Sequence, residues 1–167
     1  YNIPVIFHII HNGEAAGAGT NIAKLYVDAQ LQQLNNDFSK LAGTSGYNNH
    51  PFGSDVLVQF CAATLNPANN ALAELGIERI NRNAKGWTAP PHLGGYPYDE
   101  GRTLTHEVGH WLGLRHIWGD GDCTTDDFIF DTPRANGPNY GCAATTTNSC
   151  NDVTYGAASD SNDMVKN

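Results

Sequence analysis

Apolar residues along the first half of the chain predict an α/β fold in which a long helix covers strands. From Ile3 to Ile10 apolar residues occupy both alternating faces, which is typical of a strand buried on two sides. From about Ile22 to Leu41 they recur at spacings of four and three instead, which predicts an amphipathic helix that packs on the strands. This stripe consists of Val27, Leu31, Leu34, Phe38 and Leu41. We expect Thr20 or Asn21 to cap the helix and Gly43 to end it.

Two further strands and a second helix are expected after this helix. The segment Asp55–Leu65 is predicted to be the second strand and Ile77–Asn81 a weaker third one. The order predicts a strand-helix-strand unit followed by a hairpin. A shorter helix is expected from about Arg102 to Leu112. Its packing residues are predicted to be Val108, Trp111 and Leu112.

A histidine motif lies on this shorter helix and just beyond it. The chain reads H-E-x-x-H-x-x-G-x-x-H at His106, Glu107, His110, Gly113 and His116. Because His106 and His110 are four residues apart, both imidazoles leave one helix face about a turn apart. The two imidazoles can therefore share one metal ion. Glycine takes the left-handed conformation that ends a helix, so the turned chain after Gly113 can carry His116 to that ion. Three protein ligands and one open position are typical of a catalytic Zn²⁺ site.

Glu107 directly follows the first candidate ligand, a position that suits a base better than a ligand. Zinc lowers the pKa of its bound water to about 7, and a nearby carboxylate can take the proton as that water attacks a carbonyl carbon. The same carboxylate can then protonate the leaving amine, so the chemistry indicated is amide hydrolysis. Five fixed identities within eleven residues disfavour the alternative, a helix whose histidines merely satisfy hydrogen bonds.

The long motif resembles that of the metzincin zinc endopeptidases, and its surroundings are similar to the pappalysin family of secreted metzincins. The similarity is carried by IPVIFHIIHNG, GRTLTHEVGHWLGLRHIWGDGDC, DTP at 131–133 and NYGC at 139–142. It implies an α/β (α+β) catalytic domain with a twisted mixed sheet, a backing helix and an active-site helix, followed by an irregular part. We expect one domain over 1–167, with an upper subdomain at 1–113 that carries the zinc helix and a lower one at 114–167.

Two departures from the family pattern keep a second function open. Pappalysins place two strands before the zinc helix, and the nineteen residues 83–101 cannot supply both, so the rim is short or residues near His92 and Leu93 are missing. The last residues, which include Met164, resemble the stretch just before the family's methionine turn, so we expect the chain to stop short of it. The alternative function is a non-proteolytic zinc-binding scaffold or inactive fragment that binds peptides or partner proteins. Hydrolysis of non-peptide amides is a third, weaker one.

Composition and charge restrict the partners. Nine Lys and Arg against seventeen Asp and Glu give a net charge of −8, which argues against nucleic acid and anionic membranes. No apolar run approaches the ~20 residues of a membrane span. No signal peptide opens the chain, so we expect a mature or trimmed form. We therefore expect protein or peptide substrates, and the sequence predicts no oligomeric state.

Four cysteines indicate an oxidising compartment. Three of them, Cys123, Cys142 and Cys150, lie in the loop-rich last third, which favours disulfides and secretion. No C-x-x-C pair is present, which disfavours a second zinc site. The family resemblance implies that Cys123 pairs with Cys150, and Cys142 with a cysteine beyond the end of this chain. Cys61 lies in an apolar run and is expected to be a core thiol.

An acidic segment follows the motif. Five carboxylates fall within the twelve residues 120–131, a density that suits a hard cation such as Ca²⁺, although no EF-hand spacing is present. The alternative is a solvated acidic loop. The family resemblance implies structural calcium near the cleft, and we take Asp131 and Thr132 as its candidate ligands.

Overall fold

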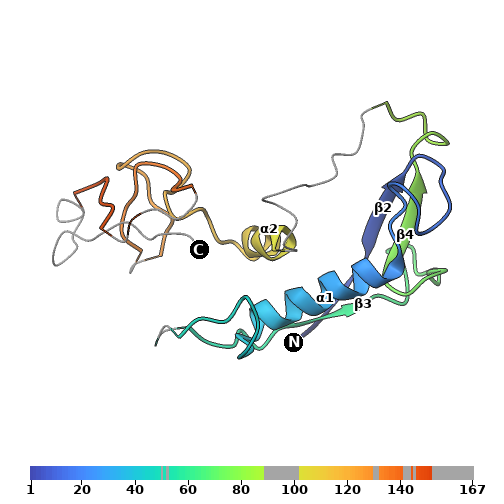
Figure 1. The fold of residues 1–167 in the computed structure, drawn as a ribbon, viewed down its shortest axis with the longest axis horizontal. Coiled ribbons are helices and arrows are strands. Elements are labelled where there is room, and N and C mark those ends of the chain that lie inside the picture. Colours follow the sequence, from blue (N-terminus) through green and yellow to red (C-terminus); the bar gives the residue numbers. More distant parts are fainter. Residues whose placement is uncertain are drawn as a thin grey trace. The chain divides into compact units, whose positions relative to one another are not determined.

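The computed structural model of the protein describes residues 1–49, 51, 53–88, 102–129, 132–140, 144 and 146–151. Its elements are, in order, β1 (Asn2–Val5), β2 (Phe7–His11), α1 (Lys24–Phe38), β3 (Gln59–Ala62), β4 (Ile77–Asn81) and α2 (Thr103–Trp111). The chain divides into two compact units, Tyr1–His106 and Glu107–Asn167, each with its own internal contacts (Figure 1). No helix in the described ranges combines the length and the apolar character that a membrane crossing needs.

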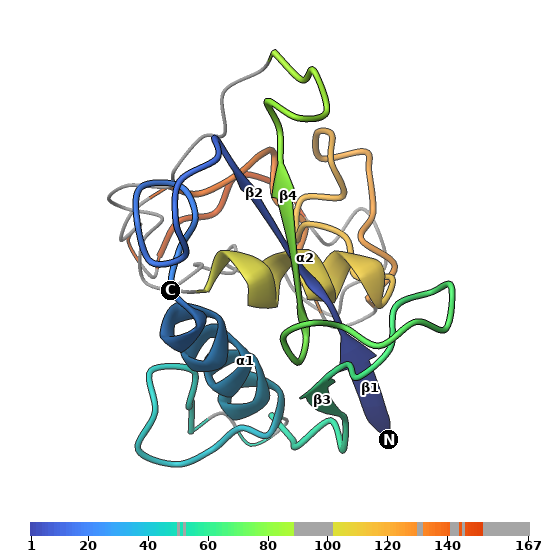
Figure 2. The ribbon, with the colours of Figure 1, turned by 90° about the vertical axis from the view of Figure 1, so that its right-hand side faces the viewer.

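Two parallel strand pairs form the sheet structure of the first unit. β1 pairs with β3, with Asn2 opposite Gln59, and β2 pairs with β4, with Phe7 opposite Ile77 (Figure 2). Parallel strands need a crossover connection, which α1 supplies. The predicted strand-helix-strand unit is therefore confirmed. The predicted hairpin is wrong for the described residues, because β4 pairs with β2 and not with β3.

The predicted first strand is two strands, because the chain changes its partner at Ile6. On one side of Ile6 the carbonyl of Val5 accepts from Ala63 N at 3.0 Å, and on the other Phe7 N donates to the carbonyl of Gly76 at 2.8 Å. Gly76 has φ +67°, and a Cβ there would lie 2.8 Å from Cβ of Ala62, so only glycine fits where the partners change. Burial on both faces is not found, since Ile10 is exposed.

α1 covers the strands through the predicted apolar stripe. Val27 and Leu34 are buried, and Phe38 packs edge to face on Phe60 at 5.2 Å between ring centroids. Asn35 donates from Nδ2 to the carbonyl of Phe60 at 2.9 Å and accepts from its amide at 2.7 Å, so one side chain satisfies both peptide groups of this β3 residue. α1 consequently runs alongside β3 (Figure 1). The central core cluster contains Ile9, Val27 and Ile77, with Phe7 packed against it.

The ends of α1 differ from the prediction. Its N-cap is Ala23, without a side-chain hydrogen bond. Thr20 and Asn21 do not cap the helix, because Thr20 Oγ1 donates to Glu14 at 3.0 Å and Asn21 Nδ2 donates to the carbonyl of Glu14 at 2.7 Å. The helix ends at Phe38 rather than at Gly43, so Leu41 lies beyond it and is exposed.

The first turn of α2 is tied to α1 by the buried side chain of Asp37, which is 3% exposed. Oδ2 of Asp37 accepts from Thr105 Oγ1 at 2.7 Å, and Oδ1 accepts from Gln33 Nε2 at 2.8 Å. The guanidinium of Arg102 lies 3.6 Å from the same carboxylate. A Cβ at Gly46 would collide with this carboxylate, so the loop after α1 also closes around it. A polar anchor therefore holds the helix that begins the histidine motif.

Three side chains predicted to be buried are exposed. Trp111 and Leu112, at the end of α2, are 69% and 42% exposed. Cys61 is also exposed, so the expectation of a core thiol is wrong. Side chains alternate along β3, and Phe60 takes the buried side, which leaves Cys61 on the open one.

Replacing Asp37 with Ala should lower the free energy of unfolding by about 1–3 kcal/mol, because Thr105 and Gln33 lose a buried acceptor. The matched control is Asp28→Ala on the same helix, where the side chain is 56% exposed and pairs with Lys24. The control should change stability by less than about 0.5 kcal/mol. Urea unfolding followed by circular dichroism measures both, and equal losses in the two variants would contradict the anchoring role of Asp37.

The loop after β2 should give the protein an acid-sensitive stability. Hydrogen bonds from its own backbone amide, and from those of Thr20 and Asn12, lower the pKa of Glu14 to about 2 from its ordinary 4.5. A depressed folded-state pKa stabilises the fold above the unfolded-state value and loses that effect as the pH falls. Glu14→Gln should therefore reduce the unfolding free energy at pH 7, and the difference from wild type should shrink between about pH 4.5 and pH 2. A difference that does not change with pH would contradict this assignment.

Candidate metal centre

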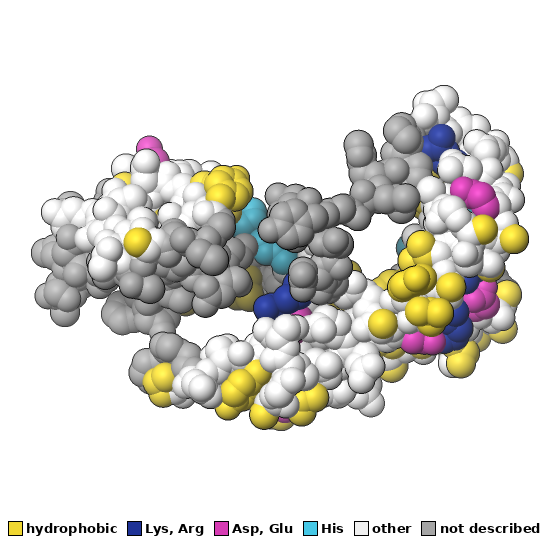
Figure 3. Space-filling view, in the orientation of Figure 1, with side chains coloured by type: hydrophobic (Ala, Val, Ile, Leu, Met, Phe, Trp, Pro, Cys, Tyr) yellow, Lys and Arg dark blue, Asp and Glu magenta, His cyan; other side chains and the backbone are white. Residues whose placement is uncertain are grey.

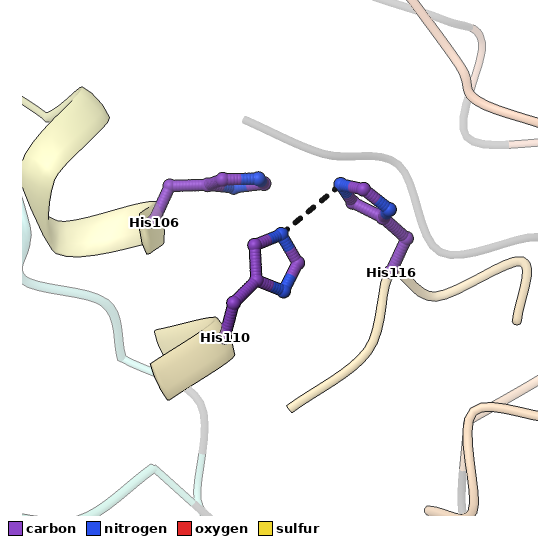
Figure 4. A group of neighbouring side chains, drawn as sticks. All are labelled: His106, His110 and His116. Atoms are coloured by element: carbon purple, nitrogen blue, oxygen red, sulfur yellow. Dashed lines mark hydrogen bonds between the residues drawn. The ribbon is translucent and has the colours of Figure 1, made fainter. Parts of the chain in front are cut away.

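Three histidines from α2 and the turn after it converge on one point (Figure 4). His106, His110 and His116 each offer one ring nitrogen, and these nitrogens lie within 4.8 Å of one another. No other group of three or more His, Cys, Asp or Glu in the described part of the chain is close enough to hold a metal. All three side chains are half-buried, and histidine reaches the surface near α2 (cyan in Figure 3).

The spacing of two of these nitrogens fits a tetrahedral metal. Nε2 of His110 lies 3.2 Å from Nε2 of His116. Two Zn–N bonds of about 2.0–2.1 Å at a tetrahedral angle place their nitrogens roughly 3.3 Å apart. The two rings stand nearly perpendicular, at 82°, with centroids 4.5 Å apart, so each presents an edge to the common point. The residues present therefore fit zinc.

The chain reversal that brings in the third histidine is built by Gly113. Gly113 has φ +99°, the left-handed region predicted for it. Its amide donates to the carbonyl of His110 at 2.9 Å, and the amide of Leu114 donates to the carbonyl of Gly109 at 3.0 Å. These two bonds form a Schellman motif, the usual way in which a helix ends on glycine. The helix therefore ends at Trp111, one residue after His110, and the chain turns back with His116.

Hydrogen bonds at the opposite ring nitrogens assign the tautomers. Nδ1 of His110 lies 2.8 Å from the carbonyl oxygen of Leu114, and Nδ1 of His116 contacts Oδ1 of Asp120. A carbonyl and a carboxylate only accept, so in both neutral rings the proton lies on Nδ1 and a lone pair on Nε2. A neutral ring that carries its proton on Nδ1 keeps the Nε2 lone pair available for a metal ion. This electronic arrangement favours metal binding.

Asp120 belongs to the acidic segment in which the sequence suggested only a calcium site or a solvated loop. The hydrogen bond from His116 is the largest cause that lowers the pKa of Asp120, and the positive charge of Arg115 also lowers it, so the carboxylate is ionised at neutral pH. The indole of Trp118 stacks on the His116 ring at 4.2 Å with 8° between the planes. Sequence reasoning missed both contacts, although Trp118 and Asp120 follow His116 closely along a glycine-containing segment, which could have suggested them.

The remaining predicted site residues are placed as follows. Glu107 is exposed on α2, directly after His106. Thr132 is half-buried and its amide donates to the carbonyl of Ile129 at 3.1 Å, whereas Asp131 lies outside the described residues. The described carboxylates of the acidic segment form no group of three that could hold an ion, so calcium stays a prediction.

Cys123 and Cys150, for which the family resemblance implies a bond, are joined by a disulfide with 5.5 Å between their Cα atoms. The bridge spans 27 residues, and closing a loop of this size stabilises a fold by roughly 3–4 kcal/mol in the chain-entropy model. It fastens the loop-rich second unit. Cys142, the segment near His92 and Met164 all lie outside the described residues, so the expectations about them stay predictions.

A model of the peptidase M43 family, described as pregnancy-associated plasma protein-A, matches residues 64–165. This match covers more than half of the chain and includes the whole histidine motif. The chain belongs to the pappalysin family. For a pappalysin, the cluster of three histidines supports zinc as the metal.

Similar proteins are named extracellular metalloproteases. The relative from Arthroderma benhamiae is 29% identical over 178 residues, which cover 84% of this chain, and that from Colletotrichum graminicola is 28% identical over 169 residues, also 84% of this chain. A relative from Coccidioides posadasii is 48% identical over 52 residues, or 31% of this chain. The chain spans 57%, 60% and 19% of the lengths of these three proteins respectively.

Solved structures with the same fold include mature mirolysin of Tannerella forsythia in complex with a cleaved peptide. The TM-score is 0.68 at 27% identity, and the match covers 89% of this chain and 77% of mirolysin. A promirolysin mutant matches with a TM-score of 0.66 at 26% identity, over 89% of this chain and 67% of that one. The predicted metzincin-like α/β fold is confirmed. The predicted subdomain boundary at residues 113 and 114 stays a prediction.

Replacing Gly113 with Ala should destabilise the protein by about 1–2 kcal/mol, because alanine resists the left-handed conformation. It should also weaken zinc binding, because the reversal carries His116. Gly109→Ala is the matched control, since a Cβ there meets only Leu114 Cδ1, at an ordinary 3.7 Å. Alanine should leave that position unchanged or stabilise it by about 0.5–1 kcal/mol. Urea unfolding and zinc titration check both variants, and two variants of equal stability would refute the assigned turn.

Proposed function

We propose that this chain is the catalytic domain of a secreted zinc endopeptidase that hydrolyses peptide bonds. The observation that carries the proposal is the convergence of three histidine nitrogens on one point, with 3.2 Å between the Nε2 atoms of His110 and His116. Membership of the pappalysin family supports it.

In this proposal His106, His110 and His116 would hold the metal through their ring nitrogens. Zinc, when bound, lowers the pKa of water and polarises the carbonyl of the peptide bond. Glu107 is the general base: its carboxylate accepts a proton from the attacking water. The same group then donates this proton to the leaving amine, because an amine must be protonated to depart. The exposure of Glu107 suits a group that exchanges protons with water and substrate.

Protein or peptide substrates and an extracellular location are part of the proposal. The mirolysin structure contains a cleaved peptide, and the fungal relatives are named extracellular metalloproteases. The disulfide between Cys123 and Cys150 supports an oxidising compartment for this chain.

Glu107→Gln should retain about one zinc per chain and lose cleavage of an unfolded protein by roughly 10²–10⁴-fold, because the variant keeps the ligands and loses the base. Glu78→Gln is the matched control, since Glu78 belongs to β4 and pairs with His8 at 2.9 Å. It should cleave at the wild-type rate. Zinc content by mass spectrometry and cleavage by gel or fluorescence give both readouts, and cleavage by Glu107→Gln at the wild-type rate would exclude Glu107 as the base.

The same assays, together with a panel of small amides, separate the rival functions. One zinc per wild-type chain without any cleavage would favour the non-proteolytic zinc-binding scaffold. Hydrolysis of small amides without cleavage of proteins would favour the non-peptide hydrolase. Turnover of an unfolded protein that a chelator stops and zinc restores is the result expected for the endopeptidase.

A further inference from the structure

We propose that Asp120 is a positioning residue of the zinc site, which fixes the ring of His116 so that its Nε2 faces the metal. The inference deepens the proposed function and rests on it, because it concerns the same three histidines.

His116 needs support that the other two histidines obtain from the helix. His106 and His110 lie on α2, whose backbone fixes the direction of their side chains. His116 lies after the helix end, in a turn whose described residues contain no helix or strand. Its ring is held by contacts within the turn: Nδ1 is bonded to Oδ1 of Asp120, and Trp118 stacks on its face. The stack restricts tilting of the ring, and the carboxylate restricts its rotation.

The backbone of the turn is shaped to bring Asp120 back to His116. The amide of Gly119 donates to the carbonyl of His116 at 2.8 Å, which closes the turn. Asp120 then has φ +63°, a left-handed conformation that glycine, Asn and Asp tolerate best. A Cβ at Gly119 would lie 2.7 Å from the amide nitrogen of Asp126, so the far side of the turn is fixed by close packing. Glycine at position 120 would be enough for the backbone conformation. The Asp carboxylate found there adds a bond to His116.

The other carboxylates that the structure describes in this segment make different contacts. Oδ1 of Asp122 accepts from the amide of Thr124 at 2.8 Å, and Oδ1 of Asp126 accepts from the amide of Phe128 at 2.7 Å. Asp127 likewise accepts from a backbone amide two residues on, at 2.9 Å. These three side chains stabilise their own turns, whereas the carboxylate of Asp120 accepts from a histidine ring.

The chemical consequence follows from the acceptor character of the carboxylate. It holds the proton of His116 on Nδ1, which leaves the Nε2 lone pair directed at the metal and makes the ring a more basic ligand. Removing a hydrogen-bond partner of this kind typically lowers metal affinity about 10–100-fold.

The experiment compares zinc affinity and ring tautomer in three variants. Asp120→Gly keeps the left-handed backbone and removes the carboxylate, Asp120→Asn keeps an acceptor oxygen, and Asp122→Asn removes one charge from the same segment as a control. Zinc affinity of the metal-free proteins is measured by competition with a chromophoric chelator. Nitrogen-15 spectra of the metal-free histidine rings report the tautomer. Thermal unfolding of the metal-free proteins reports whether the turn remains folded.

We expect Asp120→Gly to bind zinc about 10–100-fold more weakly and to lose the Nδ1-protonated preference of His116. Asp120→Asn and Asp122→Asn should stay within a few-fold of wild type, and all metal-free proteins should unfold at similar temperatures. Wild-type zinc affinity in Asp120→Gly would overturn the inference. An equal loss of affinity in Asp120→Gly and Asp120→Asn, or in Asp120→Gly and Asp122→Asn, would overturn it as well. Each of these results would leave the endopeptidase proposal intact. Absence of zinc binding by the wild type would instead overturn the proposed function itself.

Discussion

The site depends on one reversal of the chain, at Gly113. His116 is ten residues after His106, and in an uninterrupted helix it would lie about 15 Å further along the axis and on another face. The Schellman bonds from Gly113 and Leu114 end the helix at Trp111, one residue after His110, so that the third nitrogen can return. The same turn places the carbonyl of Leu114 against Nδ1 of His110. The conformation of Gly113 thus both lets His116 approach the other two histidines and places the carbonyl that accepts from Nδ1 of His110.

Polar contacts support both ends of the motif. At its beginning the buried carboxylate of Asp37 holds the first turn of α2 through Thr105. At its end the carboxylate of Asp120 contacts His116, the third candidate ligand. Hydrogen bonds are directional, so they fix the orientation of a helix or a ring more narrowly than apolar packing does. The exposure of Trp111 and Leu112 is consistent with this mode of support.

Two independent lines meet at the three histidines. The family match at residues 64–165 makes the chain a pappalysin, and the 3.2 Å between the Nε2 atoms of His110 and His116 fits two ligands of a tetrahedral metal without reference to any relative. The chain spans 57% of the length of the Arthroderma relative, so the activity of the whole protein stays a proposal that rests on the chemistry of the site. The nitrogen geometry and the exposed Glu107 beside it carry that proposal.

Local sequence patterns determined several secondary-structure elements and the histidine motif of this protein. The spacing of the histidines, the need for glycine at position 113, the stripe on α1 and the bounds of β4 follow from helix and strand periodicity, which acts over a few residues. The pairing of Cys123 with Cys150 came from family resemblance instead. The tertiary structure decided which segments pair and pack against one another, because contacts between segments far apart in the sequence leave no local pattern. The switch of strand partner at Ile6, the exposure of Cys61 and the anchoring of α2 by Asp37 all depend on which segments meet. The same holds for Asp120, since only the folded turn reveals that its carboxylate contacts a histidine ring while Asp122 and Asp126 accept from backbone amides of their own turns.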